Sequence, residues 1–302
     1  MLCRTSPSSP RADAHPVIDV DGAYDLHVHS APDLFARIAD DRQMVADAAT
    51  KGFAGVVMKN HFEGTASRAK LAAPEGGGLK VYGSLVLNRY VGGVNPYAVE
   101  AALRLGARII WMPTLDAACH RQAFGFGGGF AAQSSGLETQ SEGLSILTNG
   151  HLIPEAREVM ALARQHGAAL ATGHLSFEEI AALVAEAEGQ GFGKLILTHP
   201  YDKAPGLELE QVRALALPHV RVEFVFCSIT PHWAFTDAAT IAHCIKTIGS
   251  ARCVISSDGG QAHNPMPAEG YRRFVNLLHA EGIAAADFKV MCRDNGDDLL
   301  HG

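Results

Sequence analysis

Short apolar runs alternate with longer amphipathic stretches along this 302-residue chain, and this alternation restricts the fold more than any other feature. Most of the short runs are rich in Val, Ile and Leu and lack the regular apolar–polar alternation of a half-exposed strand. Such runs are typical of strands that are covered on both faces. We predict eight strands, over residues 24–28, 55–59, 80–87, 108–112, 168–171, 194–197, 220–226 and 252–256.

The stretches between these strands carry helix signals. Residues 95–106 and 153–167 each have a proline near the start and a glycine at the end, and residues 40–52 run from acidic residues to a glycine. Residues 176–191 open with Ser176 and Glu179, which have the spacing of a capping box. A strand–helix unit repeated about eight times predicts a (β/α)8 TIM barrel. A doubly wound open sheet is the alternative, but eight units fit the closed barrel better.

We expect a single barrel domain over residues 17–302 and a flexible tail over residues 1–16. One connection, about 114–153, is long. It contains a glycine-rich stretch, which could be either a mobile lid or a tolerated surface insertion. Further along, Asn149–Gly150 predicts a tight hairpin turn. The segment "AAADFKVMCRDNGDDLL" is interpreted as a closing helix packed on the outside of the barrel.

Composition excludes several classes of protein. The net charge of −7 and the absence of a Lys/Arg-rich stretch argue against nucleic-acid binding. No apolar run approaches the roughly 20 residues that span a membrane, and the first residues lack the apolar core of a secretory signal. The six cysteines are scattered without paired spacing, so we expect reduced thiols in a cytoplasmic protein.

Potential metal ligands follow four of the predicted strands. His27 and His29 are two residues apart, so both point to one face where the first strand ends. His174 follows the fifth strand, His199 the sixth and Asp258 the eighth. The carboxyl ends of barrel strands converge on one mouth, where active sites of such barrels lie. Imidazole nitrogen and carboxylate oxygen suit zinc and similar divalent ions.

This ordered set resembles the amidohydrolase superfamily of metal-dependent hydrolases. The matching motifs are "DLHVHS", "TGHLS", "LTHP" and "SSDGG", and the resemblance extends over nearly the whole chain from about Tyr24. The segments "ATGHLS" and "LTHP" are also similar to the phosphotriesterase-like and TatD-like branches. The resemblance implies a barrel that holds one or two divalent ions and hydrolyses a small molecule. The subfamily is not identified.

The chain departs from this family at the fourth strand. Many members bridge two ions with a carboxylated lysine or a glutamate there, whereas "WMPTLD" offers neither. Lys59, after the second strand, is the candidate substitute. It could be carboxylated and bridge two ions, bind an anionic substrate as an ammonium group, or point outward.

These residues support a hydrolytic hypothesis. His27, His29 and Asp258 would hold Zn²⁺, with Mn²⁺ as the alternative, while His174 and His199 complete a second position or shape the first. Lys59 is the candidate ligand that would bridge two ions. A bound ion lowers the pKa of water from 15.7 toward about 7, and Asp258 would act as general base. The candidate substrate contacts are His61, Arg89, Tyr201 and His232.

The bond that would be cleaved is left open among amide, lactone, ester and phosphoester bonds. Two other classes of function use the same ligands: a metal-dependent decarboxylase or related lyase, and a noncatalytic metal-binding barrel. The expected partner is a small-molecule substrate, with no nucleic acid and no membrane. Barrels of this size commonly associate, so a homo-oligomer is compatible with the sequence.

Overall fold

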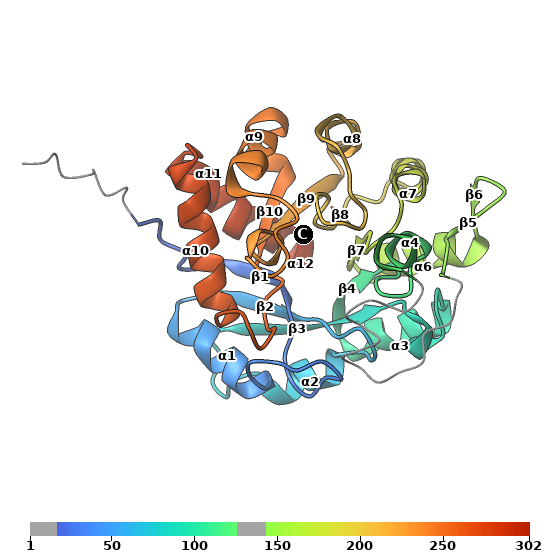
Figure 1. The fold of residues 1–302 in the computed structure, drawn as a ribbon. Helices are drawn as coiled ribbons and strands as arrows, with labels where there is room; N and C mark the ends of the chain where they lie inside the picture. The colour runs from blue at the N-terminus through green and yellow to red at the C-terminus, as the bar shows by residue number, and fades with distance from the viewer. Residues whose placement is uncertain (1–16, 126–142) are drawn as a thin grey trace, which may run out of the picture.

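Eight parallel strands form one sheet in the order β1-β2-β3-β4-β7-β8-β9-β10. The computed structural model describes residues 17–125 and 143–302, so the predicted tail 1–16 and the middle of the predicted long loop lie outside the described residues. The strands enclose a nearly closed barrel surrounded by helices, which confirms the predicted (β/α)8 fold (Figure 1). The strands are β1 (Tyr24–Val28), β2 (Gly55–Met58), β3 (Lys80–Val86), β4 (Ala107–Trp111), β7 (Ala169–Ala171), β8 (Leu195–Leu197), β9 (Val220–Val225) and β10 (Cys253–Ser256).

All eight predicted strands are present, and no end differs from its prediction by more than one residue. The apolar runs predicted them well because most of their residues are buried on both faces, as expected for a parallel sheet between an inner core and an outer helical layer.

The helices that follow the strands cover the outside of the sheet. The four predicted stretches form α1, α3, α6 and α7, and both Asp40 and Ser176 close a capping box at a helix start. The helices are α1 (Asp41–Thr50), α2 (Ala66–Ala72), α3 (Pro96–Leu105), α4 (Ala118–Phe124), α6 (Pro154–Gln165), α7 (Phe177–Gln190), α8 (Leu209–Leu215), α9 (Ala238–Ile248), α10 (Pro267–Ala280), α11 (Ala285–Lys289) and α12 (Asn295–His301).

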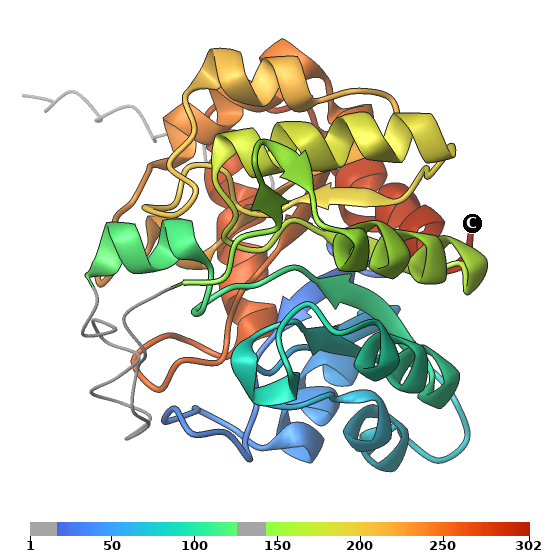
Figure 2. The same cartoon turned by 90° about the vertical axis from the view of Figure 1, so that its right-hand side faces the viewer.

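The described part of the connection between β4 and α6 contains a short helix and a hairpin. Strands β5 (Leu147–Thr148) and β6 (His151–Leu152) form the antiparallel hairpin expected around Asn149–Gly150. The sequence pattern did not predict α4, which is short and lies directly before the part of the loop that is outside the described residues. Figure 2 shows α4, in green, on the side of the barrel opposite the C-terminus.

The C-terminal segment is divided between the two sides of the sheet. Its beginning packs on the outside, where Phe288 and Met291 lie in the apolar cluster that includes residues of α9 and α10, and its end closes the bottom of the barrel. Leu299 and Leu300 of α12 are buried in the same apolar cluster as Leu26, Val57 and Ile196, which point into the barrel. Figure 1 accordingly shows the C-terminus inside the ring of helices. The predicted outside position was therefore wrong for α12 alone. Both sides of a parallel barrel strand offer an apolar surface, and the sequence does not say which one a helix covers.

A side chain helps to close the barrel between β1 and β10. The β1 residue Asp25 accepts a hydrogen bond through Oδ1 from the backbone N–H of Ser257 (2.9 Å), just beyond β10. The His29 N–H donates to the Gly259 carbonyl (2.8 Å), and Val28 bridges to Gly259. These contacts hold the ends of the first and last strands side by side.

Two observations bear on the environment of the chain. In the described part of the chain, no helix combines the length and the apolar character needed to cross a bilayer. The five described cysteines are free thiols, and all but Cys119 are buried.

The position of α12 predicts a large loss of stability for Leu299→Ala. Removing this fully buried side chain leaves a cavity at the bottom of the barrel, so we expect the free energy of unfolding to fall by about 2–5 kcal/mol in urea denaturation. Leu277→Ala is the matched control, because Leu277 is 45% exposed on α10, and its loss should stay near 0.5 kcal/mol. Equal losses for the two variants would contradict the placement of Leu299 in the apolar cluster at the bottom of the barrel.

Candidate metal centre and active site

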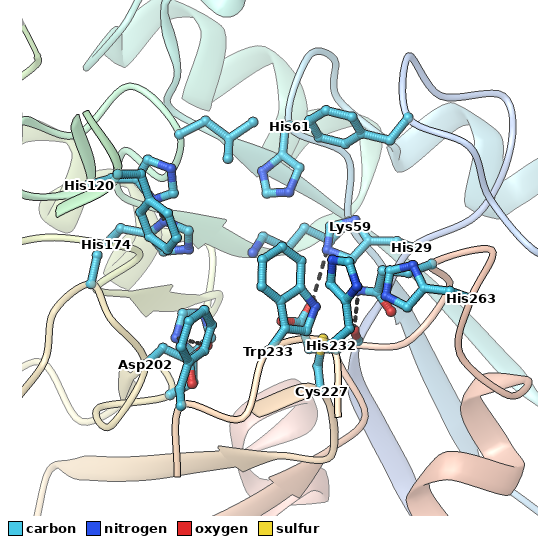
Figure 3. Close-up of a pocket in the computed structure, with 18 of the residues that line it drawn as sticks. His29, Lys59, His61, His120, His174, Asp202, Cys227, His232, Trp233 and His263 are labelled. Atoms are coloured by element: carbon cyan, nitrogen blue, oxygen red, sulfur yellow. Dashed lines mark hydrogen bonds and ion pairs between the residues drawn. The ribbon is translucent and has the colours of Figure 1, made fainter. Parts of the chain in front are cut away.

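The loops at the carboxyl ends of the strands surround one cavity of about 520 Å³. Figure 3 shows His29, Lys59, His232 and His263 gathered on one side of this cavity and His120, His174 and Asp202 on the other. Side chains that are far apart in sequence thus meet at one mouth, as the barrel predicts.

Three predicted metal ligands lie together beside the seam between β1 and β10. The Nε2 atoms of His27 and His29 lie 3.0 and 3.1 Å from Oδ1 of Asp258. One ligand atom from each residue lies within 4.8 Å of the others. In residues 17–125 and 143–302, no other group of three His, Cys, Asp or Glu side chains is close enough to share an ion.

The electrostatic environment suits this donor set. Burial, followed by the charge of Arg37, holds the pKa of His29 well below its ordinary value, so its imidazole is neutral. Burial alone would raise the pKa of Asp258, but His27 and His29 outweigh it and hold that pKa well below normal. Both groups are therefore already in the form that binds a metal ion.

The third donor, His27, is held by a second carboxylate. Burial alone would lower its pKa, but Asp258 and Glu223 outweigh this effect and raise it. Glu223 is fully buried on β9, with Oε2 3.4 Å from His27 Nδ1. A carboxylate on one ring nitrogen orients the other one toward a metal ion, which is common around metal-binding histidines.

Lys59 contacts this group without being one of its three members. Its Nζ lies 2.8 Å from His27 Nε2 and 4.2 Å from the centroid of the Trp111 ring. Burial lowers the pKa of Lys59 to about 8, because desolvation disfavours the ammonium form. Of the three possibilities left open for Lys59, the outward orientation is excluded, because the side chain lines the cavity at the mouth of the barrel.

His174 and His199 lie in the same cavity but in a second group. Their ring centroids are 5.1 Å apart, and that of His199 is 6.0 Å from that of His27. His174 Nδ1 lies 2.8 Å from Nδ1 of His120 on α4, and His199 Nδ1 lies 3.3 Å from Asp202 Oδ2. Burial lowers the pKa of His120 to about 3 and that of His174 well below normal. Both rings are neutral, so one can donate to the other.

The four predicted substrate contacts divide into two pairs. His61 and His232 line the cavity, and the ring centroid of His61 is 4.9 Å from that of His29. Tyr201 lines a separate hollow between α8 and α9, where its ring stacks on Phe224 at 6.2 Å, because its side chain turns toward the outer layer. Arg89 begins a 3-10 turn and is not among the residues that line the cavity. Neither position supports contact with a substrate in this cavity.

Residues 22–223, about two thirds of the chain, match the model of a family described as "Family of unknown function (DUF6282)". The chain belongs to this family. The matched region of this DUF6282 protein includes His27, His29, Lys59 and Glu223, and it ends before Asp258. No curated protein matched the sequence.

Solved structures share the fold of this DUF6282 protein at low sequence identity. An amidohydrolase from Pseudomonas aeruginosa is 11% identical, with 93% of this chain and 97% of that chain covered and a TM-score of 0.61. A putative 2-pyrone-4,6-dicarboxylic acid hydrolase from Pseudomonas putida is 16% identical, with 92% of this chain and 97% of that chain covered and a TM-score of 0.59. A 2,6-dihydroxybenzoate decarboxylase from Rhizobium is 14% identical, with 93% of this chain and 98% of that chain covered and a TM-score of 0.53. The resemblance to the amidohydrolase superfamily is thus confirmed at the level of the fold.

Sequence reasoning missed three charged residues around the site of this DUF6282 protein. Glu223 had a signal, because it is the one acidic residue in the apolar run "VRVEFVF". Asp202 lies three residues after His199 and pairs with it, but that spacing alone is common. Arg37 lies in the loop after β1, and nothing in its sequence neighbourhood indicates that it lines the cavity.

The backbone after β10 holds Asp258 in place. Asp258 has φ of 45°, in the left-handed region that aspartate enters more readily than most residues. Gly260 has φ of 125°, and a Cβ there would lie 1.9 Å from the carbonyl oxygen of His29. The close approach of the two metal-ligand loops therefore requires glycine at position 260.

Gly260→Ala should destabilise the chain more than a matched change elsewhere. Gly78→Ala is the control, because Gly78 has φ of 100° and no heavy atom within 4 Å of an added Cβ. Both variants share the unfavourable φ, and only Gly260→Ala adds the overlap with His29. We expect the free energy of unfolding of Gly260→Ala to fall by roughly 2 kcal/mol more in urea denaturation. Similar values would show that the two loops can separate without cost.

Proposed function

We propose that this chain is a divalent-metal-dependent hydrolase of a small molecule, in which His27, His29 and Asp258 hold the ion. The observation that carries the proposal is the convergence of these three donors beside a cavity of small-molecule size. Two imidazoles and a carboxylate suit Zn²⁺, and Mn²⁺ is the alternative. The fold shared with a solved amidohydrolase supports it.

A divalent ion at this position would supply an acidic bound water and would polarise the carbonyl or phosphoryl group of the substrate. Asp258 lines the cavity and has a 15% exposed side chain, whereas the side chain of His27 is fully buried. The Asp258 carboxylate, kept ionised by the two histidines, can accept the proton of an attacking water. It would later return that proton to the leaving group.

The remaining polar groups have proposed roles that follow from their positions. Lys59, His174 and His199 line the same cavity and would hold a second ion, with Lys59 as a ligand only in a carboxylated form. With one ion, His174 and His199 instead shape the substrate site, and Lys59 contacts an anionic group as an ammonium ion. His61 and His232 would contact the substrate from the loops after β2 and β9.

Metal content tests the proposed ligands. We expect His29→Ala and Asp258→Asn to lose most of the ion found in the purified wild-type protein, measured by plasma mass spectrometry. Glu223→Gln should retain the site but weaken metal affinity roughly 10- to 100-fold, because the Glu223 carboxylate orients the ligand His27 and is not itself a ligand. His243→Ala, an exposed residue on α9, is the control and should keep its metal. Unchanged metal content in His29→Ala and Asp258→Asn would refute the assignment.

The source of oxygen in the product tests the reaction. The metal-loaded protein would be incubated with panels of lactones, amides, esters, phosphoesters and aromatic carboxylic acids in water enriched in heavy oxygen. A hydrolase places heavy oxygen in the product, and Asp258→Asn should reduce the rate at least about 100-fold, because it removes both a metal ligand and the proposed general base. Release of carbon dioxide without incorporated oxygen would favour the decarboxylase alternative. A metal-loaded protein that is inactive on every panel would favour the noncatalytic alternative.

A further inference from the structure

We propose that Arg37 binds a carboxylate group of the substrate, so that the substrate class is a small organic acid with an apolar, ring-sized body. The inference rests on the proposed function only in calling the ligand a substrate. The binding itself requires no reaction.

Arg37 is a buried cation that lines the cavity. Its side chain is 3% exposed and pairs with Asp33, whose side chain is fully buried. Nε donates to Asp33 Oδ2 at 2.8 Å, and Nη2 lies 2.7 Å from the same oxygen. Nη2 nevertheless forms no hydrogen bond of acceptable geometry. Nη2 is itself sealed from solvent, whereas among the described residues no acceptor contacts Nη1. Nη1 is therefore the nitrogen of this cavity-lining residue that remains available to a ligand.

Asp33 does not use the whole guanidinium. Its other oxygen, Oδ1, accepts from the backbone N–H of Phe35 (3.1 Å). Arginine has five N–H donors, and within the described residues Asp33 is the only acceptor recorded for Arg37. Free N–H donors on one guanidinium nitrogen match a carboxylate oxygen through a charge-assisted hydrogen bond. Since Asp33 already balances the charge, a monoanionic carboxylate fits better than a phosphate dianion.

The backbone fixes Arg37 beside the proposed metal ligands. Ile38 N–H donates to the Gly260 carbonyl (2.9 Å), and Arg37 itself forms an antiparallel bridge with Gln261. Ala262 N–H donates to the Ala36 carbonyl (3.3 Å). The loop after β1 is thus bound to the loop that carries Asp258, and an anionic group on Arg37 would orient the rest of a ligand within the same cavity.

The apolar part of the cavity defines the body of the ligand. The Arg37 guanidinium carbon lies 5.4 Å from the ring centroid of Phe35. The ring centroid of Phe235 lies 5.5 Å from that of Trp233 and 6.1 Å from that of Phe124, so these three rings form a continuous aromatic wall. All four aromatic residues line the cavity. A wall of this kind, facing a few polar groups, suits a planar or cyclic apolar molecule that carries a polar substituent.

Calorimetric titration with benzoate, benzamide and phenyl phosphate tests the inference without any turnover. Benzoate and benzamide share a ring and differ in charge. For the wild-type protein we expect benzoate to bind roughly 10- to 100-fold more tightly than benzamide, the range for a hydrogen bond to a charged group. Phenyl phosphate should bind no more tightly than benzoate. No binding of benzoate, or a preference for phenyl phosphate, would overturn the inference.

Variants show whether Arg37 is responsible. Arg37→Gln should remove the preference for benzoate over benzamide, whereas Arg104→Gln, a 70% exposed arginine on α3, should retain it. Because Arg37→Gln leaves Asp33 buried and unpaired, the double variant Asp33→Asn/Arg37→Gln provides the same test with the charge pair removed. A preference that persists in both would assign carboxylate binding to another group, such as a bound ion. Carboxylate binding in a protein without hydrolytic activity would support this inference and refute the proposed function, so the two fail separately.

Discussion

The seam between β1 and β10 is the contact on which the candidate site depends. Asp25 and Ser257 are 232 positions apart in the sequence, and their hydrogen bond holds the first and last strands together. Slightly further toward the mouth, the backbone N–H of His29 donates to the carbonyl of Gly259. Only this closure brings the imidazoles of the first strand to the carboxylate of the last. An open sheet with the same strands would leave His27 and Asp258 at opposite edges.

Charge balance explains how so many ionisable groups remain buried at one mouth. A buried charge is costly unless another group compensates it. Here carboxylates lie behind the histidines: Glu223 contacts His27, and Asp202 contacts His199. Lys59 Nζ and Asp258 Oδ1 both contact Nε2 of His27. The arrangement keeps the imidazoles oriented while most of them stay neutral, which a metal site needs before any ion arrives.

The sequence was sufficient to predict the barrel and the positions of the main donors. Apolar runs such as 194–197 predicted strands because a parallel sheet is buried on both faces, and a residue after such a run must lie at the mouth. The sequence could not predict side-chain direction after the strand ends. Tyr201 and His199 follow the same strand, but only His199 faces the cavity. Arg37 was missed for the same reason, since its place depends on backbone contacts with residues 260–262.

The position of α12 also constrains when the barrel can finish folding. Leu299 and Leu300 complete the innermost apolar cluster, whose other members begin with Leu26 near the start of the chain. During synthesis, residues 24–256 leave the ribosome before the segment that seals their interior. Until α12 emerges, the apolar side chains that Leu299 and Leu300 cover have no partner on that side. A barrel of this design depends on contacts between distant parts of the chain, and slow final closure with transient exposure to aggregation follows from them.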